Sequence, residues 1–317
     1  MALLSRKRVI LAKTETTYGT DPTPTGAANA ILIRNLDVTP LDAEIVSRDL
    51  VRPYFGNYDQ IVAAQKVQVS FEVELQGSGA AGTAPAYAPL LLACGMSETI
   101  VASTTATYRP VSASFSSVTI YFQPQDNTAS SSPLHKVTGA RGNVEFMLNA
   151  KSLPVMKFTF TGIYNVVADV TNLTATYTAF KTPTAVNKAN TPTFSFLGFS
   201  AVMSEFGLNL NNDVVYRNLV NSESVILTDR KAGGTVVFEA PTATAKNFFT
   251  EALTGSLGNL SLIHGSTAGS IIEFAATATV DLVNPSYTEM DGIVMMSAPY
   301  VLTPTTAGND EFSLIVR

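Results

Sequence analysis

The sequence predicts a mainly β protein made of two similar β-rich halves, each with one short helix. Three observations lead to this fold class. Alternation of apolar and polar residues recurs throughout the 317 residues, two short apolar stretches interrupt it, and several short motifs appear in the same order in both halves. Alternation marks half-buried strands, and motifs repeated in order point to an internal duplication.

The clearest strand of the first half runs from Lys66 to Gln76. Val67, Val69 and Phe71 fall on one face and polar residues on the other, as expected where one face of a sheet packs on a core. Similar alternation predicts four more strands in this half, at Ala30–Val38, Ser117–Phe122, Gly142–Asn149 and Val155–Gly162.

The second half repeats this organisation. The apolar stretch Ala245–Thr254 has the spacing of a helix that buries Phe248 and Phe249, and it follows the best strand of its half just as Pro89–Met96 follows that of the first. The predicted strands of this half are Ser204–Leu210, Gly234–Ala240, Leu260–His264, Ile271–Val283 and Phe312–Val316.

Repeated motifs set the predicted domain boundaries. Arg48–Val51 reappears with one substitution as Arg217–Val220, and the distance between such copies shrinks along the chain, as expected if the first half carries an extra segment within Thr99–Pro133. Chance resemblance between two β-rich halves is the alternative. With a duplication, residues 1–164 and 194–317 are two domains, and the Thr- and Asn-rich residues 165–193 are a linker with room for an edge strand.

The composition favours a folded protein that assembles. Charged residues make up 14% of the chain, against about 25% in ordinary soluble proteins, and the apolar runs fall short of the ~18 residues of a membrane helix. A net charge of −5 argues against a general grip on nucleic acid. The apolar run after Arg8 is too short for a signal peptide, and Cys94 lies in an apolar setting typical of a core.

The long stretch Pro40–Ala64 looks irregular and combines charges with aromatic residues, which suits a protein contact. A mobile surface hairpin is the alternative. The second candidates for contacts are Leu3–Lys13 and the C-terminal tail. The contact residues predicted in the long stretch are Asp42, Glu44, Arg48, Asp49, Arg52, Tyr54, Phe55 and Tyr58.

Motifs for chemistry are weak throughout. Gly77–Gly82 matches a dinucleotide fingerprint, but Pro85 and Pro89 interrupt the helix that such a site requires, so we expect a turn with close backbone approach. His135 and His264 have no second ligand at metal-binding spacing and are expected to be structural. We therefore predict no catalytic residue, no metal and no cofactor.

Six segments, spread over most of the chain, carry a family resemblance: Ile10–Asp21, Asp49–Tyr54, Glu74–Gly79, Leu134–Gly142, Asp229–Gly233 and Ala307–Phe312. They resemble the tail tube (major tail) protein of long, non-contractile bacteriophage tails. The resemblance implies a β-sandwich or β-barrel with a flanking helix in each domain, related to the type VI secretion tube protein. Six such domains form a ring, and rings stack into a hollow tube. Two domains per chain would close a ring with three chains, and a ring of six whole chains is the competing interpretation.

The resemblance also implies partners and a location. Copies of the chain form the tube, the tape-measure protein and double-stranded DNA occupy it without tight binding, and tail terminator and distal tail proteins close its ends, with no membrane involved. The protein is expected in the virion tail after assembly in the host cytoplasm. A β-sandwich capsid-decoration or receptor-binding protein that does not polymerise is the alternative.

Within such a tube, the alternation assigns the polar strand faces to the channel, because a neutral or acidic wall would let DNA slide without sticking. The alternative is that these polar faces simply meet the water outside the protein. The predicted lining residues are Gln68, Ser70, Glu72, Glu74, Asn143, Glu145, Asn149, Lys157, Thr159, Thr161, Glu239, Thr277, Thr279 and Asp281.

Overall fold

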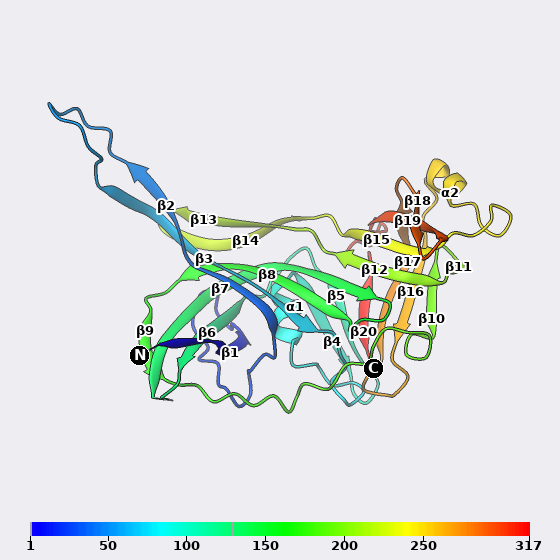
Figure 1. Cartoon of the computed structure of the whole chain (residues 1–317), viewed down its shortest axis with the longest axis horizontal. Coiled ribbons are helices and arrows are strands. Elements are labelled where there is room, and N and C mark those ends of the chain that lie inside the picture. Colours follow the sequence, from blue (N-terminus) through cyan, green and yellow to red (C-terminus); the bar gives the residue numbers. More distant parts are fainter. Residues whose placement is uncertain (1, 129) are drawn as a thin grey trace.

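The computed structural model describes residues 2–128 and 130–317, and its regular secondary structure is almost wholly antiparallel strand (Figure 1). The mainly β fold with one short helix in each half is therefore confirmed. The first half contains helix α1 (Ala88–Ala93) and strands β1 (Leu3–Thr14), β2 (Arg34–Ser47), β3 (Gln60–Glu74), β4 (Met96–Val101), β5 (Thr105–Pro110), β6 (Val118–Asp126), β7 (Ser131–Asn149), β8 (Val155–Tyr164) and β9 (Ala168–Thr171).

The second half contains helix α2 (Phe248–Thr254) and a similar succession of strands. These are β10 (Thr193–Phe196), β11 (Phe199–Ser200), β12 (Met203–Asn209), β13 (Asn212–Leu219), β14 (Ser222–Arg230), β15 (Gly233–Glu239), β16 (Gly258–His264), β17 (Ile272–Leu282), β18 (Ser286–Met290), β19 (Ile293–Leu302) and β20 (Ser313–Val316).

Eight strands form one continuous sheet, which we call the central sheet. Its order is β2-β3-β8-β7-β12-β15-β19-β18, and each strand is antiparallel to its neighbours. The first four strands come from the first half and the last four from the second. The two halves meet where Glu145–Asn149 of β7 pairs with Glu205–Asn209 of β12.

The order of strand pairing is the same in the two halves. It is β1-β6-β7-β8-β3-β2 in the first and β10-β16-β17-β19-β15-β12 in the second. In both halves the helix is the next element along the chain after the strand that is fifth in this order: α1 follows β3, and α2 follows β15. The β4–β5 hairpin overlaps the predicted extra segment, and β20 ties the halves together by pairing with both β5 and β17.

One apolar core lies under the central sheet and extends across both halves. Phe158 and Phe160 are fully buried and stack at 5.8 Å between ring centroids. At the joint, Phe274 lies 5.1 Å from Phe146 and 5.2 Å from Phe206. Truncating such a ring to alanine costs about 3–5 kcal/mol. The joint between the halves is therefore part of the core.

Helix α2 begins at Phe248, a little after the predicted start at Ala245. Asn247 sets this boundary, because its side chain accepts a hydrogen bond from the backbone N–H of Thr250 at 3.1 Å. The helix ends at Gly255, whose φ of 62° lies in the left-handed region that glycine tolerates.

The glycine-rich segment Gly77–Gly82 is a tight backbone contact, as predicted, and no helix begins directly after it. The N–H of Gly79 donates to the carbonyl of Gly269 at 2.8 Å. A Cβ atom on Gly77 would lie 2.0 Å from that same carbonyl oxygen, and one on Gly82 would lie 2.3 Å from the backbone nitrogen of Ser103. The absence of side chains here serves packing.

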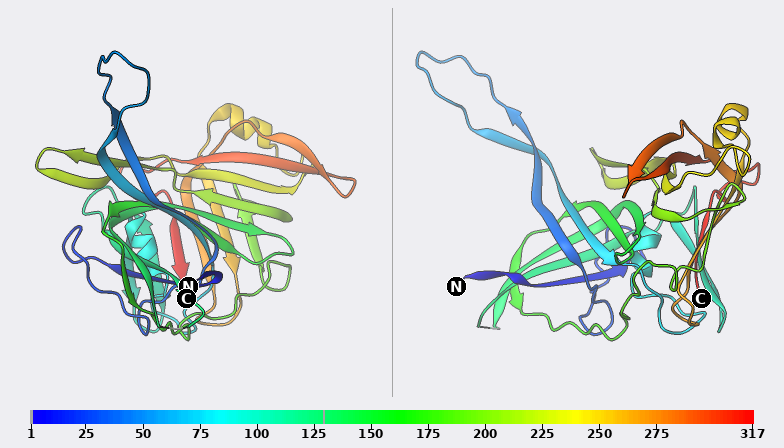
Figure 2. Two further views of the ribbon diagram at one scale, coloured as in Figure 1. Left: turned by 60° about the vertical axis from the view of Figure 1, so that its left-hand side comes forward. Right: turned by 45° about the vertical axis from the view of Figure 1, so that its right-hand side comes forward.

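The stretch Pro40–Ala64, predicted to be irregular, is mostly strand. β2 and β3 stay paired as far as Ser47 and Gln60, and they form a long arm that stands clear of the body (Figure 2). Only residues 48–59 form a loop. Alternation is a poor signal here because most of the arm is exposed on both faces, so neither face has to be apolar. We call this hairpin the first arm.

The strands that the sequence does not predict are β1, β4, β5, β10, β11, β13, β14, β18 and β19. β13 and β14 form a second arm, which lies across the first half (Figures 1 and 2). Every residue of β18 is exposed, so it lacks the apolar face that marks a strand. The predicted linker, residues 165–193, contains a short strand, because β9 pairs with Ser131–Leu134 at the start of β7.

Candidate assembly surfaces

The outward face of the central sheet carries polar residues in register across the strands. One row runs from Glu72 of β3 through Lys157 of β8 and Glu145 of β7 to Asn209 of β12. At the edge of this row, Arg34 Nε lies 2.7 Å from a carboxylate oxygen of Glu72. Residues between these positions along each strand are buried.

Most of the predicted lining residues lie together on this outward face. In the second half, Glu239 and Asp281 belong to it, because Asp281 pairs with Val301, which pairs in turn with Gly233 of β15. In the first half, the predicted residues on the face are Gln68, Ser70, Glu72, Glu74, Asn143, Glu145, Asn149, Lys157, Thr159 and Thr161.

Two predicted lining residues are placed differently. Thr279 is fully buried and its hydroxyl donates to the carbonyl of Glu311 at 2.7 Å, so the prediction that it faces a channel is wrong. The cause is an irregularity between Ala276 and Val280, where Ala278 takes a φ of 56° and interrupts the alternation. Thr277 is exposed but lies in the same irregular segment, outside the ladder of the central sheet.

Sequence reasoning missed the contribution of β12 and most of β15. Glu205, Asn209 and Thr235 share the outward face with the predicted residues. The strand Ser204–Leu210 was itself predicted, and alternation about Phe206 and Leu208, both buried, would have identified the two β12 residues.

The outward face is predominantly acidic. Lys157 lies between Glu72 and Glu145 in the strand ladder, and Lys66 pairs with Asp42 across β2 and β3 at 3.4 Å. These cations therefore sit beside carboxylates, which lowers their pull on an anion. The acidic side chains of the face are Glu72, Glu74, Glu145, Glu205, Glu239 and Asp281.

The tip of the first arm is a folded cluster with an apolar surface. The Arg52 guanidinium lies 4.7 Å from the ring centroid of Tyr54 and 4.1 Å from that of Tyr58. It also donates to the carbonyl of Asn57 at 3.0 Å. Phe55 remains fully exposed at the surface of the tip, as does the nearby Val51.

The eight predicted contact residues are spread along this first arm. Asp42 lies near its base, where its carboxylate accepts from Gln68 Nε2 at 2.8 Å, and Glu44 lies exposed further along β2. Arg48 pairs with Asp59 at 3.2 Å where the strands end. The other five predicted residues belong to the loop: Asp49, Arg52, Tyr54 and Phe55, with Tyr58 closing it.

The second arm is attached to the body of the first half. The backbone N–H of Val225 donates to the Tyr18 hydroxyl at 2.6 Å, and Arg141 Nη1 donates to the Val225 carbonyl at 2.8 Å. Tyr216 Oη donates to the carbonyl of Gln65 on β3 at 2.8 Å. Burial raises the pKa of Tyr18, so its hydroxyl stays protonated. The arm is thus held across β7, β8 and β3.

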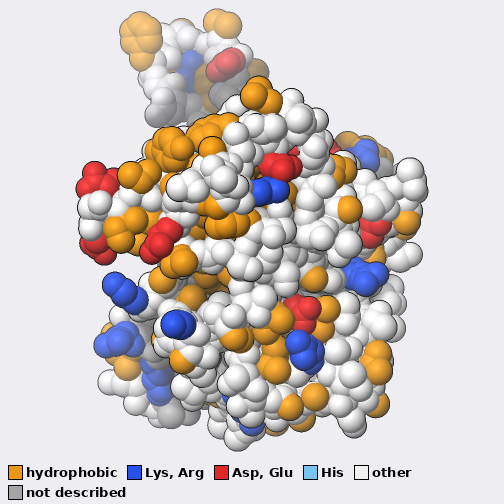
Figure 3. Space-filling model, turned by 90° about the vertical axis from the view of Figure 1, so that its right-hand side faces the viewer, with side chains coloured by type: hydrophobic (Ala, Val, Ile, Leu, Met, Phe, Trp, Pro, Cys, Tyr) orange, Lys and Arg blue, Asp and Glu red, His pale blue; other side chains and the backbone are white. Residues whose placement is uncertain are grey.

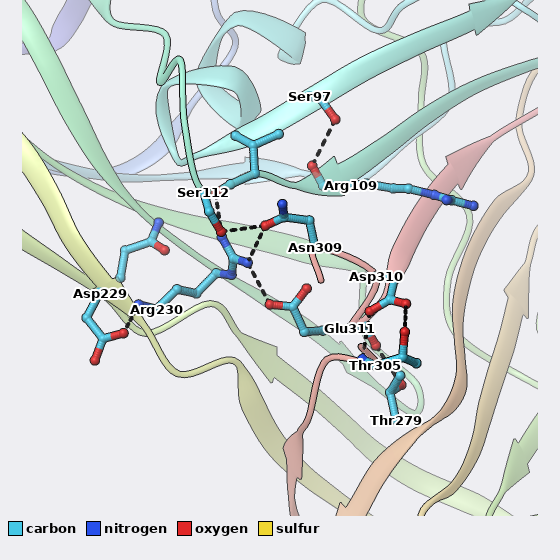
Figure 4. A network of polar contacts seen from close by, with 12 residues as sticks. Ser97, Arg109, Ser112, Asp229, Arg230, Thr279, Thr305, Asn309, Asp310 and Glu311 are labelled. Carbon is cyan, nitrogen blue, oxygen red and sulfur yellow. Dashed lines mark hydrogen bonds and ion pairs between the residues drawn. The ribbon is translucent and has the colours of Figure 1, made fainter. Parts of the chain in front are cut away.

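A buried ion pair fixes the base of the second arm (Figure 4). Arg230, the last residue of β14, places Nη2 2.6 Å from Glu311 Oε1, and both side chains are largely buried. Arg230 Nη1 also donates to the carbonyl of Val111 at 2.7 Å. Asn309 beside them accepts a hydrogen bond from Ser112 at 2.5 Å. The arm is therefore locked to the C-terminal segment.

The two secondary contact candidates differ in exposure. The predicted contact through the C-terminal tail is wrong for its last strand, because β20 is paired on both sides and Leu314 is fully buried. The start of the N-terminal candidate stays available, since Leu3 and Leu4 are exposed, whereas Val9–Ala12 are buried against the body.

An apolar surface lies at the end of the second half that carries α2 and the β18–β19 hairpin. Figure 3 views this side of the molecule and shows hydrophobic side chains gathered in its upper part. Phe249 packs against Tyr287 with ring centroids 5.4 Å apart, and both remain partly exposed. Further exposed apolar residues near them are Leu253, Met290, Ile293 and Val294.

The two histidines and the cysteine have structural surroundings. His264 Nδ1 lies 2.9 Å from the hydroxyl of Thr191, and Nε2 lies 3.1 Å from that of Thr184, so the ring holds the linker. His135 packs against Phe122. Burial lowers the pKa of both imidazoles. Cys94 is fully buried, as predicted.

The comparison with known families decides what these surfaces belong to. Residues 5–306 match the family model for phage tail tube protein. The chain belongs to this family. A tail tube protein is a structural component of the virion tail that assembles with copies of itself. No curated protein matches the sequence.

In this tail tube protein, neither helix among the described residues is long and apolar enough to span a membrane. Nearly the whole chain is covered by the match, so both halves of the central sheet and both arms fall within the family region.

Proposed function

We propose that three chains of this tail tube protein close a ring and that the rings stack into the hollow tube of a long, non-contractile phage tail. The repeated order of strand pairing supports this proposal most directly. Residues 1–164 and 194–317 then act as two tube modules, each with the fold of the type VI secretion tube protein, and 165–193 link them. Each module contributes four strands to the central sheet, so three chains contribute 24.

The strand count gives a bore of suitable width. At ~4.8 Å per strand and tilts of 35–45°, a 24-stranded barrel has a backbone diameter of about 45–52 Å. Inward side chains take about 10 Å of this. Duplex DNA, about 20 Å across by its groove depths, passes through the remainder. A ring of six whole chains would have 48 strands and a diameter of about 90–104 Å, far wider than DNA requires.

The outward face of the central sheet lines this bore. Its carboxylates repel phosphates, so DNA and the tape-measure protein pass without tight binding. The wall acts by its shape and charge, and we assign it no catalytic role. Tail terminator and distal tail proteins close the tube ends, and assembly takes place in the host cytoplasm.

Electron microscopy and native mass spectrometry of the purified protein test this function. We expect hollow filaments or stacked rings, and a single ring with a mass of about 101 kDa, three times the 33.6 kDa of one chain. Monomers or closed trimers that never polymerise would instead support a capsid-decoration or receptor-binding protein. A ring of about 202 kDa would show that a ring contains six chains instead of three.

A further inference from the structure

The central sheet ends in two strands that lack a partner on one side. Among the described residues, β2 pairs only with β3, and β18 pairs only with β19. All five residues of β18 are exposed, including the large side chains of Tyr287 and Met290. An open strand edge with exposed apolar residues is a template for pairing with another chain.

The two open edges are compatible in direction. Eight strands that are each antiparallel to the next place β2 and β18 in opposite directions. β18 of one copy can therefore join β2 of the next as one more antiparallel pair. The contact is head-to-tail, and repeated rotation closes such contacts into a ring.

The chain already contains a joint of this kind. β7 and β12 join the fourth strand of the first half to the first strand of the second, and β18 and β2 hold the corresponding positions. We infer that β18 of one copy pairs with β2 of a second copy in the register of the β7–β12 joint. This inference rests on the proposed ring and specifies its subunit contact.

The register follows from aligning the ends of β3 and β15. Glu74 and Glu239 are the last residues of these strands and both face outward. Following the paired residues across the strands, Met147 lies level with Glu74, and Thr288 lies level with Glu239. When the two glutamates are aligned, Thr288 therefore occupies in the second half the position that Met147 occupies in the first.

The partner of Thr288 is found in the same way. Met147 pairs with Gly207, which pairs with Thr235, four residues before Glu239. The residue four before Glu74 is Ser70, and it pairs with Asp37. The pairs across the contact are then Met290 with Arg34, Thr288 with Asp37, and Ser286 with Thr39, and the bulge between Arg34 and Asp37 absorbs the extra residue.

The side chains facing the core support this register. In the β7–β12 joint, the buried pair Phe146 and Leu208 lies on the core side. The equivalent pair between copies is Tyr287 with Val38. Tyr287 is 59% exposed in the single chain, and a neighbouring Val38 would cover it, as an aromatic and β-branched pair does across strands.

Cysteine pairs test the contact and the register. We would combine Thr288→Cys with Asp37→Cys and oxidise the assembled protein. The two positions lie on opposite edges of the eight-stranded sheet, about 34 Å apart over seven strand spacings, so a bond within one chain is impossible. The native Cys94 is fully buried and does not compete. We expect most chains to run as covalent trimers on a denaturing, non-reducing gel.

Matched controls keep the result specific. Either cysteine alone should give no trimer, and Tyr287→Cys with Asp37→Cys should link poorly, because these side chains face opposite sides of the sheet. Ser286→Cys with Thr39→Cys is a second pair in the same register, which serves if the first pair does not fold.

The outcomes separate this inference from the proposed function. Tubes in which neither cysteine pair links would overturn the β18–β2 contact and leave the tube function intact. Dimers linked through Thr288→Cys alone would also overturn it, because they require two β18 edges to meet. Failure of the wild-type protein to form tubes would overturn the proposed function, and the contact with it.

Discussion

The two arms are equivalent in the strand order but differ in what they touch. The second arm lies across the first half, where Tyr18, Arg141 and Gln65 bind it and the Arg230–Glu311 pair locks its base. Apart from the contacts of Asp42 with Lys66 and Gln68 at the base, the hydrogen bonds and ion pairs found for the described side chains of the first arm lie within the arm.

The difference follows from the position of each arm in the sheet. The second arm grows from β12 and β15, and β12 pairs with β7 of the first half, whereas the first arm grows from β2, which is an edge, and β3. The second arm finds its contacts within its own chain, and in the proposed assembly the first arm finds its contacts on another copy. We therefore propose that the exposed tip of the first arm is a contact surface between copies, while the equivalent hairpin is part of the fold.

The largest expected effect is the loss of assembly when the tip of the first arm becomes polar. Val51→Ser with Phe55→Ser should abolish tube formation, seen by electron microscopy and sedimentation. Both side chains are fully exposed, so the free energy of unfolding of the monomer should change by less than about 0.5 kcal/mol. Tubes of normal length from this variant would show that the tip of the first arm is not needed for the contacts between copies.

The next effect compares one ion pair from each arm. Glu311→Gln leaves the buried charge of Arg230 without its partner and should lower the free energy of unfolding by about 3–5 kcal/mol. Asp59→Asn breaks the exposed pair with Arg48 and should cost less than about 1 kcal/mol. Urea unfolding of the two variants measures both values. Equal costs would contradict the view that only the second arm is locked to the body.

A smaller effect is expected from removing one hydroxyl. Tyr18→Phe leaves the Val225 N–H and the Gly139 carbonyl without their partner, which should cost about 1–3 kcal/mol. The matched change in the first arm is Tyr58→Phe, which keeps the ring over Arg52 and should cost less than about 0.5 kcal/mol. Thermal unfolding distinguishes the two, and hydrogen exchange at Val225 should rise only in Tyr18→Phe.

The smallest effect concerns pH. Because burial lowers the pKa of His264 below its unfolded value near 6.5, the unfolded chain binds the proton more readily, and stability falls as the pH drops from about 7 through that value. His264→Asn should flatten this dependence, and His135→Asn should flatten it independently, since the pKa of His135 is also lowered. Melting temperatures across this pH range provide the measurement. An unchanged slope in both variants would contradict the assignment.

The sequence predicts many of the buried strands, misses others that also have a buried face, such as β5, β10 and β19, and predicts the exposed strands poorly. β3, β7, β8 and β15 alternate because one face of each packs on the core, and most of the polar face could be assigned from that pattern. The arms and β18 lack a buried face, so no alternation marks them. Thr279 shows a further limit, since one irregular residue, Ala278, moved it into the core.

The pairing partners were beyond sequence reasoning for another reason. Alternation shows which face of a strand is buried but carries no information about which strand lies beside it. The β7–β12 joint and the two open edges therefore emerged only from the structure, and the acidic Glu205 was missed together with its strand's place in the sheet.

Imaging of the assembled particle in cross-section tests the central claim most directly. We expect three chains per ring, six similar units around the bore, and the face with Glu72, Glu145 and Glu205 turned inward. Six whole chains around the axis, or this face turned to the outside of the tube, would contradict the account.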